Sequence, residues 1–239
     1  MNQLPSNTIP GFDLGEIIRA DDSVTVCHAI RLSDKRAVVL KITSGGYSDA
    51  LESVKLRREY ELVLPFDFSG VLKVLDMVDF GKGTAMVMDD FGGVSLSEFC
   101  GKKPLPIPDF LVVATALAGI LAELHRRGIM HKDIKPDNIL IRPETLEIRL
   151  IDFGLAVVES RGEIDTANHL DLEGSLSYLS PEQTGRMNRA PDYRTDFYSL
   201  GVTFYELLTG RLPFISTDAI ELIHAHLART PQAPAELNP

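Results

Sequence analysis

Three polar residues in one short loop, and an aspartate that follows them, are of the types that phosphoryl transfer requires. The loop carries Asp133, Lys135 and Asn138, and Asp152 then opens an Asp-Phe-Gly tripeptide. Phosphoryl transfer places charge on oxygen atoms that Mg²⁺ can neutralise, and Mg²⁺ prefers oxygen ligands such as those of Asn138 and Asp152. Asp133 lies five residues before Asn138, so one tight loop can hold a proton acceptor beside a metal ligand. Lys135 can steady a phosphate in the same loop.

Each part of this pattern also occurs without a catalytic role, so the evidence for a catalytic site comes from the order and spacing of the parts. An Asp-Phe-Gly tripeptide alone is usually a turn after a strand, and a single His131 is more often a core histidine. Apolar runs over 139–141 and 148–151 predict two short strands between the loop and the tripeptide. With these strands between them, the loop and the tripeptide resemble those of the eukaryotic-type serine/threonine protein kinases.

The resemblance implies an α+β, bilobal protein-kinase fold. It places a β-rich N-lobe with one helix at 9–91 and a mainly helical C-lobe at 92–239, incomplete at its C-terminus. The pattern along the chain agrees, because strand-like segments prevail from Gly11 to Asp89 around one helix over about 49–62. Helical segments prevail from Leu96 onward.

The family's pattern also implies a role for each residue of the loop. Asp133 matches the catalytic base, Asn138 and Asp152 match the Mg²⁺ ligands, and Lys135 matches the lysine that supports the transferred phosphate. The implied cofactors are ATP and Mg²⁺. Lys135, together with Ser175 at the position of a family threonine, fits enzymes that modify serine or threonine in proteins.

A second lysine resembles the one with which the family holds the α- and β-phosphates of ATP. Val38–Lys41 is a short apolar run that ends in this lysine, Lys41. A charge at the end of a buried strand needs a partner, which the family takes from the next helix. Glu59 is the better match for that partner, and Glu61 is the alternative.

The strand over 84–89 and the Gly-Gly pair that follows resemble the family's hinge between lobes. In that pattern Met88 is the gatekeeper, and the backbone of Asp89 and Phe91 would hydrogen-bond adenine. A strand followed by two glycines is also common elsewhere, so the spacing alone carries little weight.

The chain departs from the family's pattern in two regions. Arg19, Asp21 and Val24 stand where the family has the three glycines of its phosphate-covering loop, and Asp21 adds repulsion toward phosphate. We therefore expect weak ATP affinity or slow turnover. Lys132 replaces an arginine, and lysine is a poorer partner for a phosphorylated residue, so activation by phosphorylation is less expected. Hydroxyl groups available for it are those of Ser160, Thr166 and Ser177.

The C-terminal part carries two further matches. Ser180-Pro181-Glu182 resembles the end of the family's activation segment, and Asp196 begins a segment that resembles the helix anchoring the catalytic loop. The family supplies an arginine partner for Glu182 from later helices. Here a helix over 218–229 is followed by a Pro-rich turn, so we expect Glu182 to lack a partner and the C-lobe to be incomplete.

A closer resemblance concerns the stretches 178–189 and 192–201. They resemble the kinase module at the head of large bacterial hybrid sensor proteins, where an AAA-type ATPase region, a GAF domain and often a histidine kinase follow. The resemblance implies that further domains belong to the same longer polypeptide.

Three functions stay open on these observations. The first is a serine/threonine protein kinase in signalling. The alternative is a catalytically weak or inactive kinase-like interaction module of a larger sensor protein. A small-molecule phosphotransferase would share Asp133, Asn138 and Asp152, but it should lack the Ser180–Glu182 segment and the Asp196 helix, so it ranks last.

Composition limits location and partners. A net charge of −10 and a pI of about 5.1 argue against a nucleic-acid partner. Cys27 and Cys100 match no metal-ligand spacing and suggest a reducing compartment. Residues 1–10 lack the pattern of a signal peptide, and the apolar stretch 107–124 is interrupted by polar residues. We therefore predict a cytoplasmic protein without a membrane span.

Overall fold

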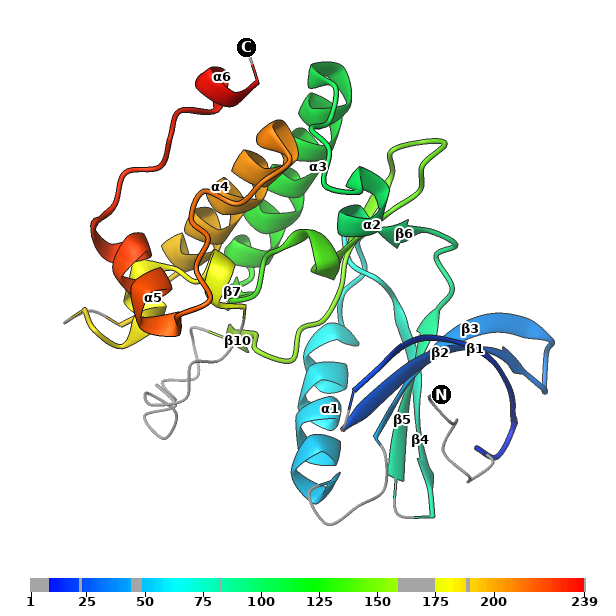
Figure 1. Cartoon of the computed structure of the whole chain (residues 1–239). Coiled ribbons are helices and arrows are strands. Elements are labelled where there is room, and N and C mark those ends of the chain that lie inside the picture. The colour runs from blue at the N-terminus through cyan, green and yellow to red at the C-terminus, as the bar shows by residue number, and fades with distance from the viewer. Residues whose placement is uncertain are drawn as a thin grey trace. The chain divides into compact units, whose positions relative to one another are not determined.

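The computed structural model describes residues 9–21, 23–43, 49–81, 83–158, 175–187 and 190–238 of the chain. The chain forms two compact units, which divide between Gly92 and Gly93. The first is a β-sheet with one helix, and the second is mainly helical (Figure 1). The predicted α+β class is therefore confirmed.

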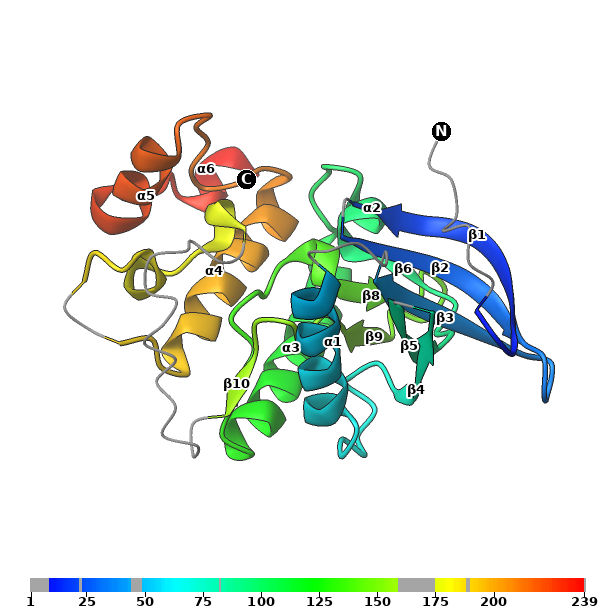
Figure 2. The same ribbon diagram turned by 90° about the horizontal axis from the view of Figure 1, so that it is seen from below.

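The first unit is built on a five-stranded antiparallel sheet with strand order β1-β2-β3-β5-β4 (Figure 2). Its strands are β1 (Phe12–Ala20), β2 (Val24–Arg31), β3 (Arg36–Thr43), β4 (Val74–Phe80) and β5 (Gly83–Asp89). Two of the inner strands, β3 and β5, are rich in apolar residues and mostly buried, as suits a strand that is covered on both sides. The helix α1 (Asp49–Val63) packs against β3, β4 and β5.

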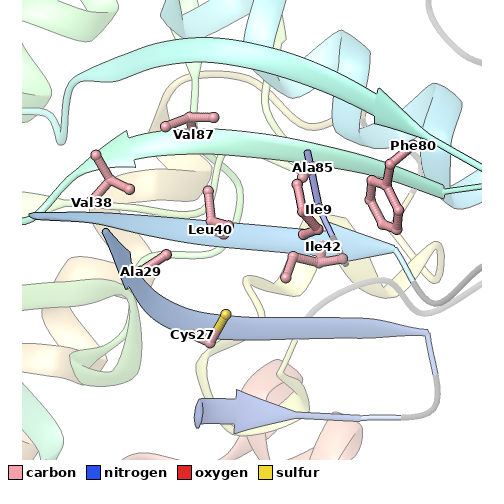
Figure 3. Packing of buried hydrophobic residues seen from close by; sticks show 9 residues of the cluster. All are labelled: Ile9, Cys27, Ala29, Val38, Leu40, Ile42, Phe80, Ala85 and Val87. Atoms are coloured by element: carbon pink, nitrogen blue, oxygen red, sulfur yellow. The ribbon is translucent and has the colours of Figure 1, made fainter. Parts of the chain in front are cut away.

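One face of this sheet carries a continuous apolar cluster. Val38, Leu40 and Ile42 of β3 meet buried residues of β2 and β5 there, and Ile9 packs among them (Figure 3). Successive side chains of a strand point to opposite faces, so Lys41 lies on the other face of β3. The helix α1 packs on that other face, because Lys41 contacts Glu59 of α1 there.

The second unit contains five α-helices and five short strands within its described residues. The helices are α2 (Leu96–Cys100), α3 (Ile107–Arg126), α4 (Arg194–Thr209), α5 (Ala219–Ala228) and α6 (Pro234–Leu237). The strands are β6 (Val94–Ser95), β7 (Ile129–Met130), β8 (Ile139–Ile141), β9 (Ile148–Leu150) and β10 (Val157–Val158). The second unit also contains the 3₁₀ turns η1 (Pro136–Asn138), η4 (Leu176–Tyr178) and η5 (Pro181–Thr184).

The helix α3 packs against α4, β7 and β9, and Figure 1 shows α3 beside α4. Its buried residues Val113, Leu117, Ile120 and Leu124 recur every three or four positions, as in a helix with one face on a core. Among the described residues, α3 is also the one helix long and apolar enough to cross a membrane by length and composition.

The C-terminal helices differ slightly from the prediction. The helix predicted over 218–229 is α5, and the Asp218 side chain caps it by accepting from the amides of Ile220 and Glu221. The prediction of a turn after it was wrong in part, because α6 forms there. Pro234 occupies the first position of α6, where the missing N–H leaves no helical hydrogen bond unmade.

A buried histidine in α5, His226, is expected to make the stability of the second unit depend on pH. The residue His226 is only 6% exposed, and its Nδ1 lies 2.8 Å from the Tyr198 hydroxyl. Burial lowers the pKa of His226 from its usual value, while the Leu176 backbone acts in the opposite direction. The unfolded chain, with an ordinary histidine pKa near 6.5, therefore takes up a proton at higher pH than the folded chain does.

We expect the free energy of unfolding to fall as pH drops from about 6.5 toward the folded pKa of His226, and to level off below it. The slope due to this one group is at most about 1.4 kcal/mol per pH unit. Urea unfolding of His226→Gln between pH 8 and pH 5 should show a shallower slope. His224→Gln, at an exposed position of the same helix, is the control. Equal slopes for His226→Gln and the unmodified chain would contradict the expectation.

Candidate active site

The first unit pairs Lys41 with Glu59. Lys41 Nζ on β3 lies 2.7 Å from Glu59 Oε2 on α1, and the two side chains are 13% and 5% exposed. Of the two glutamates that the sequence left open, the structure therefore brings Glu59 to the lysine. Glu61 is exposed on α1. The pair presents a positive ammonium whose orientation is held by a buried carboxylate.

The last residue of β5, Asp89, and Phe91, two residues beyond it, are the residues predicted to bind adenine. The Asp89 amide donates to the Lys73 carbonyl at 2.9 Å, so it is committed to the protein backbone. The Asp89 carboxylate accepts from Arg36 at 2.8 Å. Phe91 is buried, and the chain turns directly after it at Gly92, which has a positive φ of 69°. The segment is thus fixed by its own contacts.

The turn between β1 and β2, where the three glycines are absent, carries its own anion. The Asp21 carboxylate Oδ1 accepts from the amides of Ser23 and Val24 at 2.9 and 2.8 Å. The Asp21 amide donates to the Val24 carbonyl at 3.0 Å. Two amides that could face an anion are therefore already occupied by this carboxylate.

The second unit gathers the predicted loop residues around Asp133. Asp133 Oδ2 accepts from Lys135 Nζ at 2.6 Å and from Asn138 Nδ2 at 2.8 Å. Its other oxygen, Oδ1, has a long contact of 3.4 Å with the Ser175 amide. Lys135 Nζ also donates to Ser175 Oγ at 2.8 Å. One carboxylate oxygen is thus held by two short hydrogen bonds, and the other is held much more weakly.

Asn138 and Asp152 are brought close through the pairing of β8 with β9. Ile139 pairs with Leu150 in this ladder, and the Ile151 amide donates to the Asn138 carbonyl at 2.9 Å. Both hydrogens of the Asn138 side-chain amide are used on Asp133, one on Oδ2 and one on its carbonyl at 2.9 Å. Asp152 follows Ile151 with a positive φ of 65°, so a turn begins at this residue.

A buried aspartate of α4 holds the start of the loop. The Asp196 carboxylate is fully buried and accepts from the amides of His131 and Lys132 at 3.0 and 2.8 Å. His125 Nε2 lies 2.8 Å from the same carboxylate. The contacts run from α4 and α3 to the loop, as implied for the Asp196 helix. The contribution of His125 was missed, and its position in the last turn of an apolar helix gives little signal.

His131 joins the loop to the tripeptide. Its Nε2 lies 3.2 Å from the Ile151 carbonyl, and its ring packs edge-on against Phe153 with 4.7 Å between ring centroids. Burial lowers the pKa of His131 despite the opposing effect of nearby carboxylates, of which Asp196 is the strongest. The Asp133 amide also donates to Nδ1 at 3.3 Å, so the contacts on both ring nitrogens fit a neutral ring with a structural role, as in the core-histidine alternative.

In the segment 175–187 the structure overturns the prediction for Glu182 and shows a role for Gln183 that was not predicted. Glu182 was expected to lack a partner, but its Oε1 accepts from the Thr195 hydroxyl at 2.9 Å. A neutral donor on α4 thus satisfies the carboxylate without an arginine. Gln183 was missed, although the spacing Ser180-x-x-Gln183 is that of a capping box, which the turn η5 forms. Of the predicted phosphorylation positions, Ser177 lies in η4, whereas Ser160 and Thr166 lie outside the described residues.

The sequence matches one family model and several related proteins. A family model described as the protein kinase domain matches residues 20–237. Serine/threonine-protein kinase PknL of Mycobacterium tuberculosis is 32% identical over 224 residues, which cover 92% of this chain and 55% of that protein. Serine/threonine-protein kinase PrkC of Bacillus subtilis is 33% identical over 201 residues, or 83% of this chain and 30% of that protein. PkaA of Streptomyces coelicolor, of the same description, is 33% identical over 192 residues, or 79% and 34%. The chain thus spans between 30% and 55% of the length of these relatives.

Proposed function

Because the chain belongs to the protein kinase domain family, we propose that it transfers the γ-phosphate of ATP to serine or threonine hydroxyls of a protein. The observation that carries the proposal is the geometry of Asp133. Two short hydrogen bonds hold its Oδ2, from Lys135 at 2.6 Å and Asn138 at 2.8 Å. Its Oδ1 is left with one long contact and is the oxygen suited to accept the proton of a substrate hydroxyl. The relatives described as serine/threonine kinases support the substrate class.

The donor set of the loop suits a magnesium ion. Both hydrogens of the Asn138 amide point to Asp133, so its Oδ1 is the atom that remains to face a cation. Asp152 adds a carboxylate, and hard oxygen ligands of this kind are what Mg²⁺ prefers. When bound, ATP supplies the phosphoryl group and Mg²⁺ neutralises charge on its oxygens. We assign Asn138 and Asp152 as the ligands, and Lys135 as the cation that balances the charge of the phosphate in transfer.

The first unit supplies the residues proposed to bind ATP. Lys41, held by Glu59, offers an ammonium to the α- and β-phosphates. The backbone of Asp89 and Phe91 is proposed to hydrogen-bond adenine, in the case of Asp89 through its carbonyl, since its amide already donates to Lys73. The two turn amides occupied by Asp21 remove donors that a glycine-rich loop would offer, which supports a low affinity for ATP. Within the first unit, phosphate binding is then proposed to depend mainly on Lys41.

We further propose that the chain acts in the cytoplasm as one part of a longer polypeptide. The lengths of the relatives, which this chain covers only in part, support further domains. The resemblance of 178–189 to hybrid sensor proteins suggests a signalling context. A net charge of −10 supports a protein partner over nucleic acid, and α3, packed on α4, is proposed to be a core helix and not a membrane span.

Mg²⁺-dependent transfer of radiolabelled phosphate from ATP tests the proposal. We expect label on the chain itself or on a generic basic protein, with phosphoserine or phosphothreonine after acid hydrolysis. Excess EDTA should reduce incorporation to background, and added Mg²⁺ should restore it, because the loop's oxygen ligands act through the metal. A folded protein that incorporates no label with Mg²⁺ present would favour the interaction module instead.

A further inference from the structure

Lys132, the residue before Asp133, has an unusual backbone. Its φ is +68°, in the left-handed region that residues with a side chain rarely adopt. Such a conformation persists only where surrounding contacts hold it. The amide on its N-terminal side is held, because Lys132 N–H donates to the buried Asp196 carboxylate at 2.8 Å. The peptide on its C-terminal side joins Lys132 to Asp133, so its direction sets that of the proposed base.

This second peptide is also held at both of its polar atoms. The Asp133 N–H donates to His131 Nδ1 at 3.3 Å. The Lys132 carbonyl accepts from Gln183 Nε2 at 3.0 Å. Gln183 lies 51 residues further along the chain, in η5. A side chain from the segment 175–187 therefore reaches into the catalytic loop directly beside Asp133.

The neighbours of Gln183 define the orientation of its amide. Its Oε1 accepts from the Ser180 amide and from the Ser180 hydroxyl, both at 3.0 Å. The opposite end of the amide meets the Lys132 carbonyl, which can only accept. The single orientation that satisfies both sides places Nε2 on Lys132. Gln183 thus bridges the capping box of η5 and the loop, and each of its two ends has a separate partner.

We propose that Gln183 is a positioning residue, which holds the Lys132–Asp133 peptide and thereby aims the Asp133 carboxylate. The inference rests on the proposed kinase function. It also bears on regulation, because this bridge uses a side-chain amide and a backbone carbonyl and needs no phosphate. Lys132, which replaces the arginine expected to bind a phosphorylated residue, is held here through its backbone. The link between segment and loop is thus built without phosphorylation.

Gln183→Glu should remove the contact of this side chain with Lys132 and keep its contacts with Ser180. Glutamate in the spacing Ser-x-x-Glu forms a capping box as well as glutamine does, so the contacts with Ser180 are kept. A carboxylate cannot donate to the Lys132 carbonyl, so the bridge to the loop is lost. Gln183→Ala removes both. Gln232→Glu makes the same chemical change at an exposed residue whose Oε1 only accepts, from Arg211 at 3.2 Å, and serves as the matched control.

We expect Gln183→Glu to lower kcat for phosphate transfer about tenfold, with the KM for ATP and the Tm close to those of the unmodified chain. Gln183→Ala should lower both kcat and Tm, and Gln232→Glu should change neither. Amide hydrogen exchange over residues 131–135 should be faster in Gln183→Glu than in Gln232→Glu. If Gln183→Glu keeps the full kcat and the same exchange, the residue is only a cap and the proposal is overturned.

The exchange measurement separates this inference from the proposed function. If the unmodified chain transfers no phosphate, the kinase proposal is wrong whatever the exchange measurement shows. Exchange over residues 131–135 then still decides whether Gln183 holds the loop. Faster exchange in Gln183→Glu supports the bridge, and unchanged exchange overturns it.

Discussion

Asp133→Asn is expected to lower the rate of phosphate transfer by about 10²- to 10⁴-fold, the usual contribution of a positioned proton acceptor. Asparagine has nearly the same shape, and its oxygen can still accept from Lys135 and Asn138, as the carboxylate does at 2.6 and 2.8 Å. The neutral side chain cannot take the proton of a hydroxyl. The KM for ATP should therefore stay near its original value while kcat falls.

Asp13→Asn, at an exposed position of β1, is the matched control, since it removes one carboxylate without touching the loop. Transfer is measured with saturating ATP and Mg²⁺, and Tm is recorded for all three proteins. A kcat for Asp133→Asn within a few-fold of the unmodified chain, at equal Tm, would assign the proton acceptor elsewhere.

Lys41→Met is expected to have two separate effects. Transfer should fall to background, because the ammonium proposed to bind the phosphates is gone. The free energy of unfolding should also fall by about 3–5 kcal/mol, because Glu59 keeps a charge at a position that is only 5% exposed and loses the ammonium 2.7 Å away.

The double variant Lys41→Met/Glu59→Leu separates these effects. An apolar pair of similar volume should recover most of the lost stability, since the buried charge is removed together with its partner. It should not recover transfer. Urea unfolding and ATP-dependent labelling of the single and double variants measure the two quantities. Recovery of activity in the double variant would show that Lys41 serves stability and not phosphate binding.

The parts of the site that could be predicted are those whose residues lie close together in the sequence. Asp133, Lys135 and Asn138 lie within six residues, so their spacing alone requires that they share a loop, and the structure joins them by hydrogen bonds. The strands β8 and β9, between the loop and the Asp-Phe-Gly tripeptide, were predicted from short apolar runs. The choice between Glu59 and Glu61 needed one more fact, namely which face of α1 meets Lys41 on β3.

The parts that could not be predicted depend on segments that meet across long stretches of chain. Gln183 contacts Lys132 across 51 residues, and no local pattern indicates that a glutamine in a turn will meet a carbonyl in the loop. Thr195, which satisfies Glu182, is an ordinary helical residue until α4 packs beside η5. Asp21 was predicted only as a source of repulsion, because its hydrogen bonds with the Ser23 and Val24 amides depend on the shape of the turn.

The contacts of Asp196 carry a consequence for the order of folding. Its carboxylate binds the amides of His131 and Lys132 from 65 and 64 residues further along the chain. Closing a loop of that length costs chain entropy before any contact repays it, and such non-local contacts form late. The α-helices, built from local hydrogen bonds, can therefore form before the loop does. During refolding the return of enzymatic activity should trail the return of helical circular dichroism, because the loop acquires its shape only when α4 has docked.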